Sequence, residues 1–86
     1  MTLFKETVLK IVREIPKGNT LSDGEIALQA GHPGAARAVG TIMKDNYDES
    51  VPCHRVLAAN GGIGQYNRGG PVAKRALLIK EGVLVV

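Results

Sequence analysis

The chain has 86 residues, a formal net charge of +3 and a sequence pI near 9.3, and 44% of its residues are hydrophobic. This length suits one domain with one core, and the hydrophobic fraction excludes a disordered chain. The chain contains no run of about 18 apolar residues, so no membrane span is predicted. Charged residues interrupt the apolar N-terminal stretch, which excludes a signal peptide. The single cysteine favours a reducing, cytoplasmic setting (or a nuclear one in a eukaryote).

The N-terminal segment predicts an amphipathic helix from Leu3 to Ile15. Its apolar residues fall on one helical face, and its charged residues lie elsewhere. Pro16 and Gly18 then end the helix and turn the chain. The residues predicted to face the core are Phe4, Val8, Ile11, Val12 and Ile15.

Two short helices follow and outline a helix-turn-helix unit. The first is predicted from Asp23 to Ala30, because Ser22 and Glu25 have the spacing of a capping box. The second is predicted from Ala35 to Lys44, and Pro33 suits a first helical position before it. A tight Gly-His-Pro connection joins the two helices.

The second of these helices carries small residues on one side, with Arg37 among them. Two interpretations are open. Small residues permit tight packing against another helix, and they also permit close approach to a nucleic acid into which Arg37 would reach. The mildly basic charge permits a nucleic-acid partner without requiring one. The small residues are Gly34, Ala35, Ala36, Ala38 and Gly40.

The C-terminal half is predicted to be extended, then rich in turns, then helical. Residues 51–57 (VPCHRVL) are predicted to be extended, since the residue before a proline disfavours helix. The Gly- and Asn-rich stretch after them predicts a loop, with a candidate hairpin at Asn60–Gly61, and the apolar tail, residues 83–86, is expected to pack back or pair as a strand. Pro71 opens a last helix that runs through Glu81, and Gly82 closes it. The predicted inner face of that helix is Ala73, Ala76, Leu77 and Leu78.

These elements together predict a mainly α, winged-helix-like helix-turn-helix domain with at most a short β element. The surroundings of Cys53 leave its role open. A thiol reacts as its thiolate, which a nearby base or cation favours, and His54 and Arg55 follow the cysteine. Neighbours in an extended segment point to opposite faces, however, and many free cysteines are simply buried. No Cys/His cluster has zinc spacing, so no metal is expected.

Taken together, the motifs resemble the C-terminal, DNA-binding and active-site domain of the O6-alkylguanine-DNA alkyltransferases, also called methylated-DNA–protein-cysteine methyltransferases. The similarity covers nearly the whole chain. It is carried by AARAVG (residues 35–40), Asn46, PCHRV (residues 52–56), GGIGQY (residues 61–66) and KEG (residues 80–82). Residues 1–86 are expected to form one such domain, without the N-terminal domain of many members, and to act alone as a monomer.

The resemblance implies a DNA repair protein that transfers an alkyl group from O6-alkylguanine in double-stranded DNA irreversibly to its own cysteine, without a cofactor or metal. Cys53 matches the nucleophile, and His54 matches the base that takes the thiol proton through water. Glu81 matches the acid that orients His54. Tyr66 matches the hydroxyl that donates to guanine N3 as the base leaves, and Asn46 matches a brace of the active-site turn.

The resemblance also implies that the second helix of the helix-turn-helix unit enters the minor groove. Ala35, Ala36 and Gly40 would permit that approach. Arg37 matches the arginine that fills the space left by a base flipped out of the duplex. Arg55 is grouped with these DNA-binding residues.

Each implied role has a structural alternative. Glu81 would be a solvated helix end, Tyr66 would anchor a loop, and Arg37 would pair with Asp45 or Glu49. Two other functions also stay open. One is an alkyltransferase-like module that binds the lesion without alkyl transfer, although such relatives typically carry Trp in place of the cysteine. The other is a general DNA-binding helix-turn-helix domain whose cysteine is structural.

Two positions depart from the family pattern. Asp23 stands where the family usually has a Tyr that pushes a DNA phosphate during base flipping, and an acid there would repel the phosphate. Asn46-Tyr47 stands where the family has Asn-Pro. Tyr47 is a candidate for lining the alkyl pocket.

Overall fold

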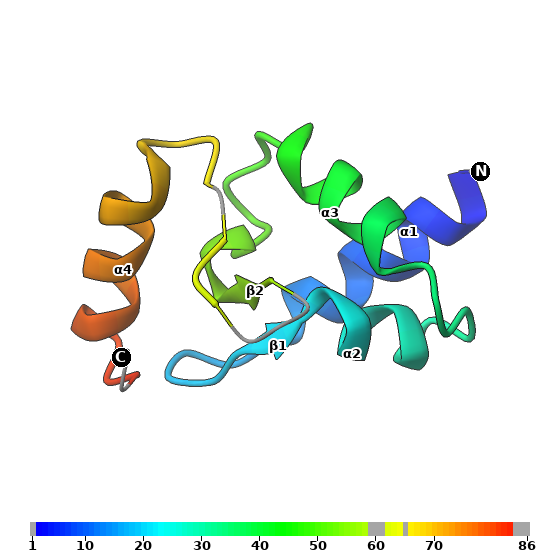
Figure 1. Cartoon of the computed structure of the whole chain (residues 1–86), viewed down its shortest axis with the longest axis horizontal. Helices are drawn as coiled ribbons and strands as arrows, with labels where there is room; N and C mark the ends of the chain where they lie inside the picture. Colours follow the sequence, from blue (N-terminus) through cyan, green and yellow to red (C-terminus); the bar gives the residue numbers. More distant parts are fainter. Residues whose placement is uncertain (1, 59–61, 65, 84–86) are drawn as a thin grey trace.

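Four α-helices dominate this computed structural model, which describes residues 2–58, 62–64 and 66–83. Figure 1 shows α1, α2 and α3 grouped at one end of the molecule and α4 at the other, with a short sheet between them. The fold is therefore mainly α with a short β element, as predicted. The elements in chain order are α1 (Thr2–Arg13), β1 (Leu21–Ser22), α2 (Asp23–Gln29), α3 (Ala36–Lys44), the 3-10 turn η1 (Cys53–Arg55), β2 (Val56–Leu57) and α4 (Gly70–Lys80).

The first helix supplies one wall of the core. Three of its predicted inward residues, Phe4, Val8 and Val12, are buried, and Ile11 packs at the edge of the same cluster. The helix ends at Arg13 rather than at the predicted Ile15, which is buried just beyond it. The period of apolar residues alone was sufficient to predict this face. Within the described ranges, no helix combines the length and apolarity needed to cross a membrane. The main cluster comprises Phe4, Val8, Val12, Ile15, Ile26, Ala27, Val39, Met43, Val51, Cys53 and Val56.

The capping box confirms the predicted start of α2. The backbone N–H of Glu25 donates to Ser22 Oγ, and the Ser22 N–H donates to Glu25 Oε1 at 2.9 Å. Ser22 also belongs to β1, which pairs in parallel with β2 so that Leu21 lies opposite Val56. One serine therefore both starts α2 and joins the sheet that leads to the cysteine.

The predicted helical position of Pro33 is wrong, because α3 begins three residues later at Ala36. Pro33 and Gly34 instead form the centre of a tight turn in which the Ala35 N–H donates to the His32 carbonyl at 3.0 Å. Gly34 has a φ of +94°, which suits the third position of a type II turn and is incompatible with a right-handed helix. The proline therefore shapes the helix-turn-helix connection.

The last helix buries one residue that the sequence analysis missed. Leu78 is buried as predicted, but Ala76 is exposed and Lys74 is 3% exposed. Lys74 lies four residues before Leu78 and so on the same helical face. Gly82 ends the helix with a φ of +91°. The candidate hairpin at Asn60–Gly61 and most of the tail lie outside the described residues.

Removing the Ser22 hydroxyl is expected to destabilise the domain. Ser22→Ala deletes one acceptor of the capping box and should lower the free energy of unfolding by about 1 kcal/mol, measured by urea unfolding. Ser22→Thr keeps the hydroxyl and serves as the control. Equal losses in the two variants would show that the cap does not contribute.

Candidate active site

The prediction that residues 51–57 are extended is wrong at the cysteine. Cys53–Arg55 form a 3-10 turn, in which the Cys53 N–H donates to the Val51 carbonyl at 2.8 Å and the Arg55 N–H donates to the Pro52 carbonyl at 2.9 Å. Successive side chains of a 3-10 turn point about 120° apart. The turn therefore directs Cys53 to one side while His54 and Arg55 both reach Glu81.

The Glu81 carboxylate is the centre of a buried polar cluster. His54 Nε2 lies 2.8 Å from Oε2, and Arg55 donates to Oε1 at 3.0 Å and to Oε2 at 2.9 Å. The Glu81 side chain is 12% exposed, so the alternative of a solvated helix end is wrong. Hydrogen bonds from Arg55, with a further one from His54, lower the pKa of Glu81 to about 2 against the opposing effect of burial. Glu81 is therefore ionised at neutral pH.

This arrangement fixes which nitrogen of His54 carries hydrogen. An ionised carboxylate only accepts hydrogen bonds, so His54 Nε2 donates to Glu81. In the neutral imidazole, Nδ1 is then left as an acceptor. The His54 ring also meets Tyr66 edge to face, with ring centroids 6.5 Å apart.

Arg55 extends the cluster to the first helix of the core. Its Nη1 donates to the Ile15 carbonyl at 2.9 Å, beyond the end of α1, and its side chain is 16% exposed. The guanidinium thus joins the Cys53 turn, α4 and the α1 end. Contact of Arg55 with DNA stays a prediction, which this inward geometry disfavours.

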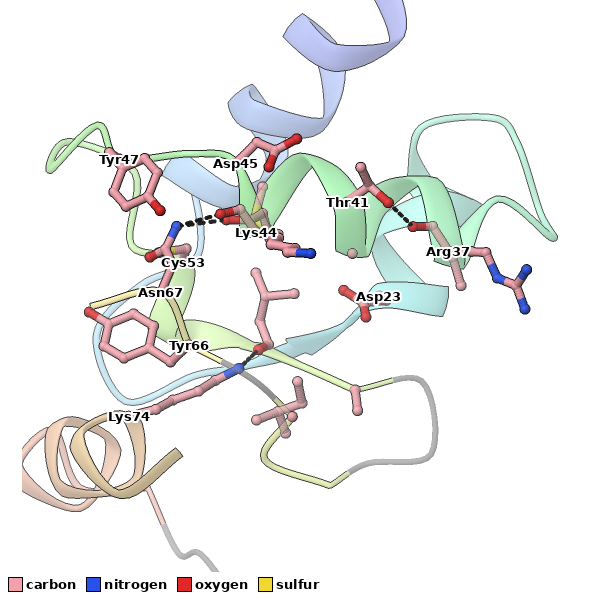
Figure 2. Close-up of a pocket in the computed structure, with 17 residues that line it drawn as sticks. Asp23, Arg37, Thr41, Lys44, Asp45, Tyr47, Cys53, Tyr66, Asn67 and Lys74 are labelled. Carbon is pink, nitrogen blue, oxygen red and sulfur yellow. Dashed lines mark hydrogen bonds between the residues drawn. The ribbon is translucent and has the colours of Figure 1, made fainter. Parts of the chain in front are cut away.

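Cys53 opens into a pocket of about 630 Å³, a volume typical of small-molecule sites. The cysteine is 5% exposed. Figure 2 shows Cys53 and Tyr66 at one end of the pocket, with Lys74 reaching in from α4. Tyr47 is exposed and lines the same pocket. Its predicted contact with the alkyl group stays a prediction. His54 and Glu81 are not among the residues that line the pocket.

Burial shifts the pKa values of several titratable groups in the pocket, among them Tyr66 and Lys74. Burial raises the pKa of Tyr66, and the charge of Cys53 adds to this rise while Arg68 opposes it. Burial lowers the pKa of Lys74, against the attraction of Asp23 and Cys53. The Lys74 ammonium donates to the Val56 carbonyl. Tyr66 is therefore a protonated donor at neutral pH, and Lys74 is held against the strand beside the cysteine.

Asn67 is a second residue that the sequence analysis missed. Its Nδ2 donates to the carbonyls of Lys44 and Asn46 at 2.8 and 2.7 Å, and to that of Met43 at 3.3 Å. The Met43 and Lys44 carbonyls lie in the last turn of α3 and that of Asn46 just beyond it, so one amide ties the loop of Tyr66 to the helix-turn-helix unit. In the sequence, only its position next to Tyr66 in a Gly-rich loop could have indicated that Asn67 has a role at the site.

Asn46 lies in the segment between α3 and the cysteine. Its Oδ1 accepts from the Asp48 N–H at 3.3 Å, and its Nδ2 is buried without a partner among the described residues. Asp48 in turn accepts from the Ser50 N–H and hydroxyl. The predicted role of Asn46 as a brace rests here on one long hydrogen bond, and stays a prediction.

The small residues of α3 divide between two faces. Ala35 and Ala38 pack against the core, whereas Ala36 and Gly40 line the pocket. Arg37 is exposed, and Figure 2 shows its side chain directed away from Cys53. Within the described ranges no carboxylate lies within ion-pair distance of Arg37, so its predicted pairing with Asp45 or Glu49 is not observed. The packing interpretation therefore holds for the core-facing side of α3.

No cluster of three or more His, Cys, Asp or Glu side chains with metal-binding geometry occurs among residues 2–58, 62–64 and 66–83. The site brings together one thiol in a pocket, a histidine with a fixed hydrogen-bond partner, and a partly buried phenol.

Comparison with known proteins identifies relatives over almost the whole chain. Residues 3–83 match the family model described as 6-O-methylguanine DNA methyltransferase, DNA binding domain. A Shigella flexneri methylated-DNA–protein-cysteine methyltransferase is 44% identical over 99% of this chain and 50% of its own length. A Cricetulus griseus protein of the same name is 40% identical, with 38% of its length covered. The chain thus spans about half or less of the length of these curated relatives.

Two solved structures extend the similarity to three dimensions. The Mycobacterium tuberculosis OGT in complex with DNA has a TM-score of 0.83 and 51% identity, over 91% of this chain and 48% of that one. S. pombe Atl1, in complex with damaged DNA containing O6-carboxymethylguanine, has a TM-score of 0.86 and 37% identity. The match covers 98% of this chain and 80% of the Atl1 chain.

Acid is expected to remove the stabilisation that Glu81 provides. The pKa of Glu81 is about 2 in the folded chain, below its ordinary value of 4.5. Its contribution is therefore complete above about pH 4.5 and is lost as the pH falls toward 2. At neutral pH, Glu81→Gln should lower the free energy of unfolding by about 3 kcal/mol. That deficit should shrink between about pH 4.5 and about pH 2, measured by urea unfolding at constant ionic strength.

The exposed Glu49 provides the matched control. Glu49→Gln should follow the wild-type protein across the same pH range. A deficit in Glu81→Gln that stays constant down to the lowest pH would contradict the ionised cluster.

Proposed function

The chain belongs to the 6-O-methylguanine DNA methyltransferase family, and from this membership we propose that it repairs O6-alkylguanine in double-stranded DNA by transferring the alkyl group to its own Cys53. The observation that carries the proposal is the position of Cys53. Its thiol borders a pocket, and the next two residues of the same turn, His54 and Arg55, are hydrogen-bonded to Glu81. Each protein molecule would react once, because the thioether product is stable.

The transfer is a single displacement. The Cys53 thiol loses its proton through water to His54 Nδ1, the nitrogen left as an acceptor. The sulfur then attacks the alkyl carbon, the new S–C bond forms, and the bond from that carbon to O6 breaks. Its electron pair leaves with guanine. The ionised Glu81 stabilises the protonated His54 that results, so the acid is a positioning and charge-balancing group.

The departing guanine needs a proton or hydrogen-bond donor as negative charge develops on its ring. Tyr66 supplies that donor in the proposed reaction. Its raised pKa keeps the hydroxyl protonated, and it lines the same pocket as Cys53. Donation to guanine N3 is the expected contact.

The lesion must leave the base stack to reach Cys53, because the thiol is nearly inaccessible from the surface. We assign α3 to the DNA minor groove and Arg37 to the space that the flipped base vacates. Arg37 is exposed on the same helix that supplies Ala36 and Gly40 to the pocket wall. A basic side chain in that position also favours contact with phosphates. We further propose that the 86 residues act as one monomeric unit.

A second candidate is a module that binds the lesion without removing the alkyl group. The similarity to S. pombe Atl1 in complex with damaged DNA favours it, as does Asp23 at the pocket wall. The presence of Cys53 favours transfer. The two candidates share the pocket and differ only in whether Cys53 becomes alkylated.

The mass of the intact protein distinguishes these functions. After incubation with a duplex that carries O6-methylguanine, wild-type protein should gain one methyl group in place of one hydrogen, and fragmentation should locate the methyl on Cys53. Cys53→Ala should show no gain and should still bind the lesion in a mobility-shift assay, because the pocket and α3 are retained.

Methylation that persists in Cys53→Ala would overturn the assignment of the nucleophile. Tight lesion binding without any mass change in the wild-type protein would support the second candidate. Duplex binding with neither lesion preference nor mass change would leave a general DNA-binding domain.

Arg37→Ala should slow transfer from duplex DNA roughly tenfold, since an inserted side chain offsets part of an unstacking cost of a few kcal/mol. Transfer from free O6-methylguanine base should change little, because no base must be flipped. The rates are measured by single-turnover kinetics on both substrates. Arg75→Ala, which removes an exposed cation of α4, is the charge control. Equal slowing of both substrates by Arg37→Ala would contradict its role in flipping.

A further inference from the structure

The pocket contains a half-buried carboxylate that the proposed transfer does not use. Asp23 is the first residue of α2 and lines the pocket that Cys53 borders. Its carboxylate lies against α3, because a Cβ added to Gly40 would stand 3.5 Å from Asp23 Oδ2. Figure 2 shows Asp23 at the pocket wall beneath α3. Asp45, which also lines the pocket, is exposed at the C-terminal end of α3. Asp23 is thus the half-buried acid that a bound base would meet.

The neighbouring polar groups leave Asp23 as the strongest acceptor for a ligand N–H. The Val56 carbonyl already accepts from Lys74. The Asn67 amide donates its hydrogens to carbonyls at and just beyond the end of α3, and its Oδ1 is a neutral acceptor without a partner among the described residues. Lys74, Tyr66 and Arg37 present donors. An ionised carboxylate only accepts, and its hydrogen bonds are stronger than those of a neutral oxygen.

The proposed substrate has one N–H group that could donate to the Asp23 carboxylate. Alkylation at O6 removes the hydrogen from N1 of guanine, so the exocyclic amine at C2 is the only N–H donor left on the base. Other O-alkylated bases, such as O6-methylhypoxanthine and O4-methylthymine, lack that amine. The amine is freed from its partner strand when the base is flipped.

We propose that the Asp23 carboxylate accepts a hydrogen bond from the C2 amine of O6-alkylguanine and thereby selects guanine among O-alkylated bases. This inference rests on the proposed function, since it takes O6-alkylguanine as the ligand of the pocket. Asp23 is then a specificity-determining residue. Burial raises its pKa and the nearby Lys74 cation opposes that rise. The desolvated carboxylate therefore has more to gain from a ligand donor than an exposed one has.

A purely structural role for Asp23 makes a different prediction. Asp23 would then serve only as an electrostatic partner of Lys74 or as an acid at the start of α2. Its loss would slow all substrates by the same factor. A contact with the C2 amine instead affects only substrates that carry the amine, so the two roles separate in a comparison of matched bases.

The test compares two duplexes that differ only in that amine, one with O6-methylguanine and one with O6-methylhypoxanthine. Single-turnover methyl transfer is measured for wild-type protein, Asp23→Ala, Asp23→Asn and the exposed control Glu49→Ala. Wild-type protein should prefer O6-methylguanine by about tenfold or more, the size expected for a hydrogen bond to a charged group. Asp23→Ala should reduce that ratio toward one, Asp23→Asn should give an intermediate ratio, and Glu49→Ala should keep the wild-type ratio.

Equal slowing of both bases by Asp23→Ala, with the ratio unchanged, would overturn the proposal. Should Asp23→Ala fail to unfold cooperatively, Asp23→Asn decides: an unchanged ratio in that variant would likewise overturn it. If the wild-type protein transfers no methyl group, the proposed transfer fails, and the same ratio is taken from dissociation constants for the two duplexes. A binding preference lost in Asp23→Ala would then still support the contact, and a preference retained would refute it.

Discussion

The hydrogen bonds to the Glu81 carboxylate join α4 to the turn that carries Cys53. Glu81 caps α4, whereas its partners His54 and Arg55 belong to the turn of Cys53. Arg55 continues to the Ile15 carbonyl beyond α1. The main apolar cluster includes no described residue of α4, although Leu78 of that helix is fully buried. These charge-assisted bonds, the bond of Lys74 to β2 and the burial of Leu78 together attach α4 to the rest of the domain.

In the proposed reaction the same cluster also acts on the chemistry of Cys53. An ionised Glu81 fixes the hydrogen on His54 Nε2 and leaves Nδ1 to accept. The acid also neutralises Arg55, which would otherwise be a buried cation beside the histidine. Stability and reactivity are therefore coupled: a change at Glu81 that disturbs the histidine also loosens α4.

The sequence was informative where the signal is local or periodic. The buried face of α1 follows from the spacing of apolar residues, and the capping box needs only Ser22 and Glu25. The environment of Glu81 was not predictable from local pattern, because its partners lie 26 and 27 residues away. The turn at Cys53 was missed because the proline before it argues for extended backbone, whereas the nearby carbonyls stabilise a 3-10 turn.

The small residues of α3 illustrate why one sequence feature supported two interpretations. A helix in contact with a core on one side and a pocket on another needs small side chains on both, and α3 places Ala38 toward the core and Gly40 toward the pocket. Gly40 also faces the Asp23 carboxylate. Arg37 projects from the exposed side of the same helix. In the proposed reaction, α3 would therefore both displace the base through Arg37 and supply part of the pocket wall that receives it. Because one rigid helix carries both features, it sets the distance between Arg37 and that wall.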